Sequence, residues 1–523
     1  MVFLLALIIT IVAALAPSGE IRFDLAADPS TLNPLFAHAD AASVEQQVDR
    51  LLFEPFVDID EQGRAIPQLL ETIPSLENGG ISHDGKTIVY KLRRGVVWSD
   101  GVPVDADDVL FTLAAIMDPR NPVRSRAGYE LIERATRLDA RTVEIHLRRP
   151  WAPAVATFFS YGTSPQYVLP KHLLAGIGGL AEAPFNRRPV GNGPYLFASW
   201  RSGERLRFAS NPRYWKGAPA VSALNVAIVP DPGTNLILLQ SGGVDWNLIA
   251  PSQEPVVARN PKLKFRYVAL ALVAGIVFNT AHPPLDDARV RRALAASIDR
   301  EAISRKITFG RYPVIETAQP LRSWARDPAV RQPRFDPREA DRLLDEAGWR
   351  RGPDGRRARD GRRLALVYVQ FPESRTGVAT ATFVQSELRD RGIDLTIKSI
   401  ANAQLFLPKT GILAAGTFDL AYVPFQMGAD PDDSFLFACD GIANYARWCD
   451  REVDGLERRA VASPSRLERK RLYGEIERVV ARDVPVLFLF NPSYIYAYDA
   501  RLRGFSPNAF SPTWNAGGWS VTR

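Results

Sequence analysis

The segment from Leu364 to Lys398 constrains the fold more than any other part of this sequence. LALVYVQ (Leu364 to Gln370) is a short apolar run with the length and branched residues of a buried strand. A helical pattern follows from about Gly377 to Arg391 and stops at Gly392, and IDLTIK (Ile393 to Lys398) then alternates apolar and polar residues. Two strands connected through a helix pair in parallel, because the helix carries the chain back along the sheet. The sequence therefore predicts an α/β domain in its second half.

The length of 523 residues is too great for one hydrophobic core, so two or three domains are expected. The first half is β-rich: GKTIVYKLRRGVVWSDG (Gly85 to Gly101) predicts a hairpin, and ARTVEIHLRRP (Ala140 to Pro150) predicts another strand. Leu263 to Thr280 and Asp483 to Tyr498 are apolar extended segments, each expected to cross between two lobes. Two such crossings would form a hinge and return the C-terminus to the first lobe.

The N-terminal residues differ from the rest of the chain. VFLLALIITIVAALA (Val2 to Ala16) has the length of a signal peptide and is short for a membrane span, which needs about 20 residues. Pro17 follows the Ala-x-Ala end and disfavours cleavage there, so residues 1–19 are expected to be a signal peptide or an N-terminal anchor. The remainder is expected to be exported, and in an exported protein Cys439 and Cys449 are predicted to form a disulfide.

Charge and motif content argue against several functions. The net charge of +7 is spread along the chain, and the basic run from Arg350 to Arg363 is interrupted by Gly, Pro and Asp, which predicts a solvated hairpin tip and no nucleic-acid partner. The five histidines lack metal-ligand spacing, and no HExxH, GxSxG or P-loop pattern occurs. No metal, cofactor or catalytic residue is therefore expected. An exported hydrolase remains an alternative, because paired carboxylates cannot be recognised from one sequence.

The aromatic content points to ligand binding. Trp246 and Trp514 are candidates for stacking on a ligand, since binding clefts are mostly apolar with a few polar groups. YVPFQMGADPDDSFLF (Tyr422 to Phe437) predicts a strand, an acidic turn and an aromatic run. This stretch is either a solvated turn after a core strand or the wall of a ligand cleft.

Seven segments, in order along the chain, resemble the extracytoplasmic solute-binding proteins of family 5, which serve dipeptide and oligopeptide ABC importers. They are DPSTLNPLF, IPQLLETIPSLENGGISHDGKTIVYKLRRGVVWSDGVPVDADDVLFT, PVGNGPYLFASW, NPRYWKGAP, PLDDARVRRALAASIDREAI, LLDEAGW and NYARWCDREVD. The resemblance implies an α/β, two-lobe periplasmic-binding-protein fold of type II, in its three-part peptide-binder variant with a two-segment hinge. It also implies a periplasmic monomer without enzymatic activity that captures a peptide or peptide-like solute and delivers it to an inner-membrane ABC permease.

The same resemblance suggests how the chain divides. Residues 20–55, 187–270 and 495–523 are expected to form the core of lobe I. Residues 56–186 are expected to form an extra β-rich subdomain of lobe I, and residues 271–494 the α/β lobe II.

The resemblance also implies that the strand from Tyr422 to Gly428 lines the cleft and pairs with an extended ligand. The expected cleft wall is the backbone of Pro424, Phe425, Gln426, Met427, Gly428, Ala429 and Asp430. Family members that bind peptides usually carry an Asp, which holds the ligand's ammonium, where this chain has Met427. A buried ammonium without a counter-charge costs about 3–5 kcal/mol. Either Asp430 or Asp432 substitutes, or Met427 only packs, or the solute is a metal chelate, an opine or a sugar derivative and not a peptide.

Overall fold

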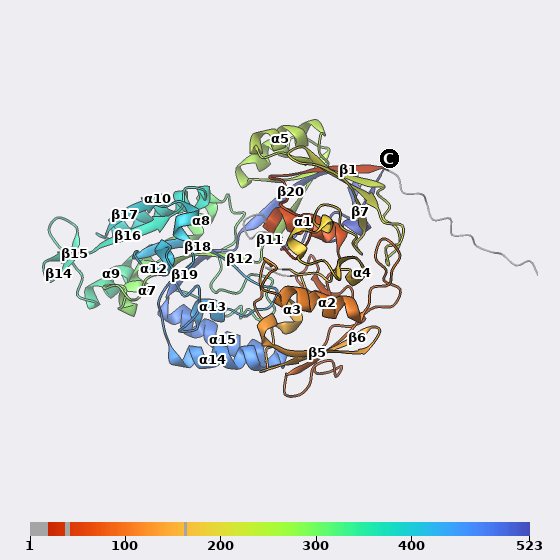
Figure 1. Cartoon of the computed structure of the whole chain (residues 1–523). Helices are drawn as coiled ribbons and strands as arrows, with labels where there is room; N and C mark the ends of the chain where they lie inside the picture. Colours follow the sequence, from red (N-terminus) through yellow and green to blue (C-terminus); the bar gives the residue numbers. More distant parts are fainter. Residues whose placement is uncertain (1–18, 37–41, 162–164, 523) are drawn as a thin grey trace, which may run out of the picture.

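The computed structural model describes residues 19–36, 42–161 and 165–522, which form two lobes (Figure 1). Lobe I comprises the described residues of 19–269 and 493–522, and lobe II comprises residues 272–490. Both lobes mix helices and strands, so the predicted α/β class is confirmed. The apolar run from Val2 to Ala16 lies outside the described residues. Within the described ranges, every helix is too short or too polar to cross a membrane.

Lobe I contains three main sheets, with strand orders β1–β9–β8–β7, β10–β20–β11 and β4–β6–β5. Strand β1 pairs in parallel with β9, and the other neighbours are antiparallel. The strands are β1 (Glu20–Leu25), β4 (Thr87–Lys91), β5 (Ile132–Asp139), β6 (Thr142–Leu147), β7 (Tyr195–Arg201), β8 (Arg205–Ser210), β9 (Ala223–Ile228), β10 (Trp246–Ile249), β11 (Leu263–Ala269) and β20 (Ser493–Asp499). Two small pairs complete the lobe: β2 (Val57–Ile59) with β3 (Ala65–Pro67), and β21 (Leu502–Arg503) with β22 (Ser520–Val521).

Lobe II is organised around a five-stranded mixed sheet of order β17–β16–β18–β12–β19. Its strands are β12 (Leu272–Phe278), β16 (Ala365–Gln370), β17 (Asp394–Ser399), β18 (Leu420–Gln426) and β19 (Val486–Phe490). Strands β16 and β17 pair in parallel through α10 (Arg375–Asp390), so the predicted β-α-β unit is confirmed. Strand β12 is antiparallel to both of its neighbours.

The helices of lobe I are α1 (Ala42–Leu52), α2 (Ala106–Met117), α3 (Ala154–Thr157), α4 (Lys171–Leu174), α5 (Pro232–Ser241) and α6 (Glu254–Val257). Those of lobe II, besides α10, are α7 (Ala288–Ser297), α8 (Arg300–Ile307), α9 (Pro337–Glu346), α11 (Asn402–Leu405), α12 (Ile412–Ala415), α13 (Ser434–Phe437), α14 (Arg451–Ala462) and α15 (Arg466–Asp483). The long pair α14 and α15 lies below the sheet in Figure 1 and extends toward lobe I.

Each lobe has its own hydrophobic core. In lobe I the buried apolar side chains of residues 56–186 join those of the rest of the lobe in one cluster. A second cluster lies between α5 and the β10–β20–β11 sheet. The core of lobe II extends from Val273 to Phe490. Among the described residues no cluster contains side chains of both lobes, so the two interiors are packed independently there.

Each predicted crossing consists of two strands in different lobes with a short link between them. Strands β11 and β12 are joined at Leu270, and β19 and β20 are joined at Asn491 and Pro492. The N–H of Leu270 donates to the carbonyl of Pro492, 2.9 Å away. The Asn491 amide donates to the carbonyls of Leu270, at 2.9 Å, and Leu272, at 2.7 Å. The two connections therefore lie side by side.

The hairpin predicted within Gly85 to Gly101 is wrong. Strand β4 pairs with β6, which is the strand predicted within Ala140 to Pro150. Gly95 has a φ of +75° and turns the chain, and beyond it only an isolated bridge forms between Val97 and Pro103. The pairing is therefore between distant segments, which local alternation could not reveal.

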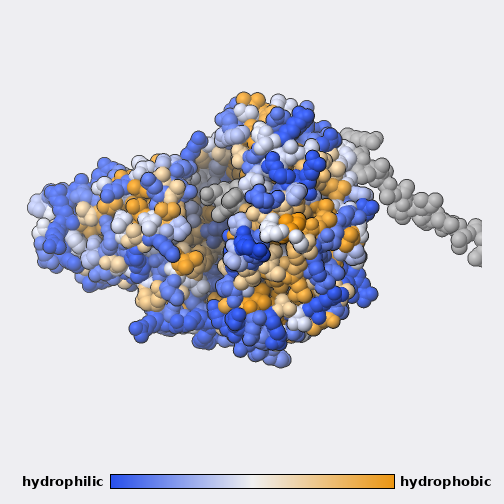
Figure 2. Space-filling model, viewed as in Figure 1, coloured by the Kyte–Doolittle hydropathy of each residue, from blue (hydrophilic) through white to orange (hydrophobic). Residues whose placement is uncertain are grey.

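The basic run from Arg350 to Arg363 forms a small three-stranded sheet at the far end of lobe II, made of β13 (Arg350–Arg351), β14 (Arg357–Arg359) and β15 (Arg362–Arg363). Most of this tip is hydrophilic surface, visible at the left of Figure 2. Arg357 is the exception to the predicted solvation. It is buried and contacts Asp341, at 2.7 Å, and Asp345, at 2.6 Å.

Candidate ligand-binding site

A cavity of about 700 Å³ lies between the two lobes. The lobe I side of its lining comes from residues within 57–88 and 151–161, and the lobe II side from residues within 322–324, 429–430 and 462–469. The surface in Figure 2 is indented between the lobes. Cavities that hold small solutes measure roughly 300–1,000 Å³, so this one has the volume of a ligand site.

The lobes touch at the edge of this cavity. The N–H of Ala152 in lobe I donates to the carbonyl of Val461 in lobe II, 2.7 Å away. On another side Gly63, in the turn between β2 and β3, lies so close to Arg322 that a Cβ added there would be 3.2 Å from the Cβ of Arg322. Both contacts involve or adjoin lining residues, so the cavity is bounded by both halves of the molecule.

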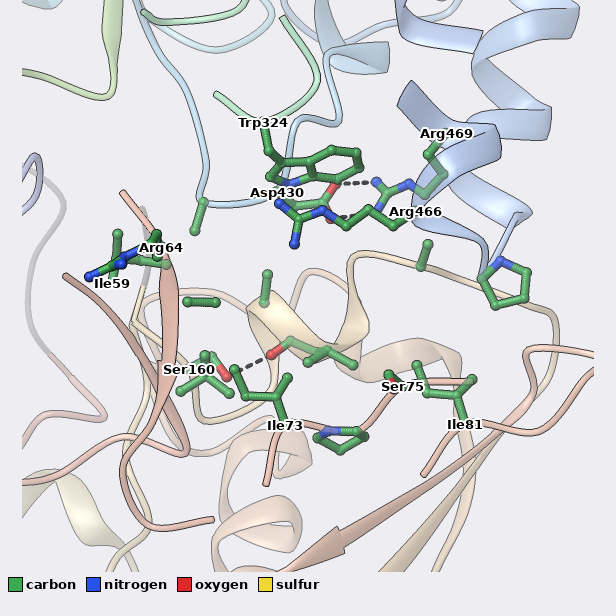
Figure 3. Close-up of a pocket in the computed structure, with 18 of the residues that line it drawn as sticks. Ile59, Arg64, Ile73, Ser75, Ile81, Ser160, Trp324, Asp430, Arg466 and Arg469 are labelled. Carbon is green, nitrogen blue, oxygen red and sulfur yellow. Dashed lines mark hydrogen bonds and ion pairs between the residues drawn. The ribbon is translucent and has the colours of Figure 1, made fainter. Parts of the chain in front are cut away.

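The lobe I wall is mainly apolar. Ile59, Ile73 and Ile81 project toward the cavity in Figure 3, and Trp151 and Val155 also line it. The hydroxyl of Ser160 is directed back to the carbonyl of Val155, at 2.7 Å. This wall therefore offers a mainly apolar surface, and its charged lining residues are Arg64, which pairs with Asp60, and Glu77.

A buried ion network holds the lobe I wall in place. Arg50 on α1 is 1% exposed, pairs with Asp58 within β2, and lies 3.7 Å from Glu54. It also donates to the carbonyls of Phe53, at 2.8 Å, and Trp514, at 3.1 Å. Because Asp58 stands between two lining residues, this network fixes the position of the apolar wall.

The lobe II wall carries an ion pair. Arg469, on the first turn of α15, donates through both terminal nitrogens to the carboxylate oxygens of Asp430, with the longer contact 2.8 Å. Burial alone would lower the pKa of Arg469, but the adjacent Asp430 carboxylate holds that pKa above its ordinary value. Asp430 therefore has its charge compensated within the protein.

Trp324 covers this pair in Figure 3, and two arginines stack on it. The Arg466 guanidinium lies 4.6 Å from the centre of the Trp324 ring, and that of Arg469 lies 5.5 Å from it. Stacked guanidinium groups keep their in-plane N–H donors available. Trp324 thus supports two cations on the lobe II side of the cavity.

The segment that carries Trp324 is fixed by hydrogen bonds. The Gln319 amide donates to the carbonyl of Pro431, at 2.8 Å, and to Asp433, at 3.0 Å. Ser323 donates to the Gln319 side-chain oxygen at 2.7 Å, and the N–H of Leu321 donates to Asn491 at 3.0 Å. This segment is therefore attached to the acidic turn after β18 and to the connection between the lobes.

A buried carboxyl pair lies behind this wall. Burial and the neighbouring Asp432 raise the pKa of Asp433 to about 7, and burial and Asp433 raise the pKa of Glu457 on α14 well above its ordinary value. Two ionised carboxylates this close would repel each other, so the pair holds a proton.

The predicted cleft wall from Pro424 to Asp430 is only partly a cavity wall. Ala429 and Asp430 line the main cavity, and Met427 and Gly428 line a small adjoining cavity of about 50 Å³ together with Ala429 and Asp430. Pro424, Phe425 and Gln426 line neither cavity, because they belong to β18 inside the lobe II sheet. There they pair with β12 from Leu272 to Ala274, and Phe425 is packed in the core.

Met427 is 1% exposed and belongs to the lobe II core, and its N–H donates to the carbonyl of Ala271 at 2.8 Å. The candidate substitutes for an ammonium-binding Asp are both engaged. Asp430 pairs with Arg469, and Asp432 accepts the N–H of Ser434 at 3.0 Å. Packing therefore accounts for Met427, and neither acid is free.

The two tryptophans selected from the sequence lie outside the cavity linings. Trp246 is 3% exposed and stacks in the lobe I core, with ring centres 4.7 Å from Phe23 and 5.3 Å from Phe505. The Trp514 indole donates to the carbonyl of Ser506 at 2.5 Å, and its own carbonyl accepts Arg50. Neither tryptophan lines these cavities, and an aromatic residue near a turn or a strand end has the same sequence signature in a core as in a cleft.

Four residues that shape the lobe II wall were not selected from the sequence: Arg322, Trp324, Arg466 and Arg469. They come from an irregular segment and from a charged helix, and no motif marks either one. Cys439 and Cys449 form a disulfide in the loop between α13 and α14. Among the described residues no group of three or more His, Cys, Asp or Glu side chains is arranged to hold a metal ion.

The profile of the bacterial extracellular solute-binding proteins, family 5, matches residues 65–445 of this chain. The chain belongs to this family. Di/tripeptide-binding protein 2 of Pseudomonas aeruginosa is 30% identical over 477 residues, which cover 85% of each protein. As a family 5 protein the chain is the substrate-binding component of an ABC importer, and the hydrolase alternative is wrong because the family consists of binding proteins and not of enzymes.

Solved structures that share the fold include two complexes with different ligands. The oligopeptide-binding protein AppA of Bacillus subtilis, in complex with a nonapeptide, has a TM-score of 0.74 and 23% identity, covering 97% of this chain and 99% of its own. NikA of Brucella suis, in complex with Fe(III)-EDTA, has a TM-score of 0.83 and 21% identity, covering 97% and 100%. The predicted periplasmic-binding-protein fold is confirmed.

Proposed function

We propose that this family 5 protein captures a peptide or peptide-like solute in the periplasm and delivers it to an inner-membrane ABC permease. The observation that carries the proposal is the 700 Å³ cavity between the lobes, with an apolar wall on one side and charged groups on the other. Relatives whose names state that they bind di- and tripeptides support the peptide assignment.

The proposed mechanism is closure about the two connections at Leu270 and Asn491. In this proposal the described residues of 20–55, 187–270 and 495–522 form the core of lobe I, with those of 56–186 as an added β-rich part. Lobe II ends at Phe490, because Ser493 and Tyr494, expected in lobe II from the sequence, belong to β20 of lobe I. The contact between Ala152 and Val461 at the cavity edge is then a contact of the closed form. A closed form of this kind is what the permease would recognise.

A non-peptide solute is the second candidate. The position that holds the ligand's ammonium in peptide binders of this family is the buried Met427 here, and Asp430 is paired with Arg469. Structural neighbours bound to Fe(III)-EDTA and to Ni(L-His) show that this fold also accommodates metal chelates.

Native mass spectrometry of the protein purified from its own compartment distinguishes the two candidates. A series of short peptides supports the first, and one defined non-peptide compound supports the second. In either case the bound compound is expected to raise the melting temperature and to reduce the radius of gyration measured by X-ray scattering. If no compound copurifies, and no peptide or chelate alters melting or scattering, the proposal is wrong.

A cavity-filling variant tests whether the ligand binds in this cavity. Ala156→Trp on α3 places an indole into the cavity and is expected to abolish binding. Ala379→Trp on the exposed face of α10 is the matched control and is expected to leave binding unchanged.

A further inference from the structure

The charged groups around the cavity do not balance. Four arginines and two acids line it. Arg469 is compensated by Asp430, and Arg64 lies 2.7 Å from Asp60. Within the described parts of the chain, Arg322 and Arg466 have no ion pair with a carboxylate. Both belong to lobe II, so this wall presents two uncompensated positive charges to the cavity.

Both arginines are held by structured segments. Arg322 lies between Leu321, whose N–H is bound by Asn491, and Ser323, whose hydroxyl is bound by Gln319. Arg466 begins the 18-residue helix α15 and stacks on Trp324. The positive end of the helix dipole adds to the charge at the same place, since Pro464 and Arg466 both line the cavity.

The remaining acid is on the opposite side. Glu77 is exposed in a turn of lobe I, where hydrogen bonding by Ser75 lowers its pKa. Ile73 and Ile81, before and after Glu77 in the sequence, project toward the cavity from lobe I (Figure 3). The cavity therefore has a cationic side on lobe II and an apolar side on lobe I.

We propose that the captured solute carries a carboxylate, held by Arg322 and Arg466, and an apolar body that lies against the isoleucine wall of lobe I. A free amino group contributes nothing to its affinity. This inference rests on the proposed function and names the chemical class of the solute taken by the same cavity. It includes amino-blocked peptides and other amphipathic acids.

Four forms of Leu-Leu test the inference by isothermal titration calorimetry: the free dipeptide, its N-acetyl derivative, its C-terminal amide and the form blocked at both ends. The two forms with a free carboxylate are expected to bind about 10- to 100-fold more tightly than the two amides, because a hydrogen bond to a charged group is worth about 1.5–3 kcal/mol. Acetylation of the amine is expected to change affinity less than about threefold.

Variants assign the effect to particular side chains. Arg322→Gln and Arg466→Gln are each expected to remove most of the preference for the carboxylate. Lys470→Gln, one turn further along α15 and outside the cavity lining, is the matched control and is expected to preserve it. Glu77→Gln is expected to leave the affinity for free Leu-Leu unchanged. Circular dichroism confirms that each variant is folded.

The outcomes separate the inference from the function on which it rests. If the four compounds bind but amidation has no effect, or if Glu77→Gln and acetylation each weaken binding tenfold, the solute class is wrong while the binding function stands. If none of the four binds the wild-type protein, the proposed capture of peptide-like solutes is wrong as well.

Discussion

Replacing Arg469 by Met tests the ion pair that neutralises Asp430. The two side chains are 6% and 14% exposed, so the pair is largely removed from water. After the substitution, Asp430 keeps the hydrogen bond donated by the N–H of Asp432, at 3.0 Å, and loses the cation that compensates its charge. In the reverse variant, Asp430→Asn, Arg469 keeps the hydroxyl of Tyr473, at 3.2 Å, and the Trp324 ring.

The magnitude follows from the burial of the pair. Each single substitution leaves one charge uncompensated, and we expect a loss of about 3–5 kcal/mol in the free energy of unfolding of lobe II. The double variant Asp430→Asn/Arg469→Met removes both charges. It is expected to be more stable than the sum of the two single losses predicts, by about 1–3 kcal/mol.

The free energies of unfolding of the wild type, the two single variants and the double variant are measured by urea denaturation, monitored by tryptophan fluorescence and circular dichroism. Arg471 and Glu475 provide a matched control on the same helix, because their side chains are 53% and 35% exposed. Arg471→Met is expected to cost no more than about 0.5 kcal/mol. Equal losses in Arg469→Met and Arg471→Met, or a coupling between Asp430 and Arg469 below about 0.5 kcal/mol, would refute the reasoning.

Three further predictions concern lobe II. Met427→Asp is expected to lower the free energy of unfolding by about 3 kcal/mol or more, because it places an unpaired charge in a core, while Met427→Leu costs less than about 1.5 kcal/mol; thermal denaturation measures both. Burial and Asp432 raise the pKa of Asp433 in the folded protein to about 7. The free energy of unfolding therefore includes a contribution from protonated Asp433 that is complete below the pKa of this residue in the unfolded chain and is lost as pH rises through about 7. The stability of wild type relative to Glu457→Gln should therefore decrease between about pH 5 and about pH 8, and a pH-independent difference would contradict this. The double variant Cys439→Ser/Cys449→Ser should lower the free energy of unfolding by about 2–3 kcal/mol, because the disulfide no longer restricts the unfolded chain around this short loop. Reduction of the wild-type disulfide should lower the melting temperature to a similar extent.

The sequence predicted those parts of the fold that depend on neighbouring residues. The β-α-β unit from Ala365 to Ser399 was recognisable because its strand and helix periods, and Gly392 at the helix end, are local signals. The partner of β4 was not recognisable, because that strand pairs with β6, with α2 and β5 between them in the sequence. Alternation within one segment does not identify such a distant partner.

The site was less predictable than the fold. Ala429 and Asp430 could be placed at the cleft by their resemblance to the family, but the partner of Asp430 is Arg469, 39 residues away on a helix whose sequence shows only ordinary surface charge. The sequence does not distinguish Trp324 from Trp246, yet Trp324 lines the cavity and Trp246 is packed in the lobe I core. The roles of these residues depend on contacts between segments that are distant in the sequence, and a single sequence does not reveal those contacts.

The adjacent connections between the lobes determine which relative movements are easy. The two connecting segments, joined by the Asn491 amide, can rotate about the axis along which they lie. Sliding one lobe past the other would instead break the hydrogen bonds from Asn491 to Leu270 and Leu272. Displacement about a fixed axis grows with distance from it. Residues close to the axis, such as Met427, whose N–H binds Ala271, would hardly move, while Ala152 and Val461 at the cavity rim would move more. Discrimination between shorter and longer solutes should therefore arise at the rim and not beside the axis.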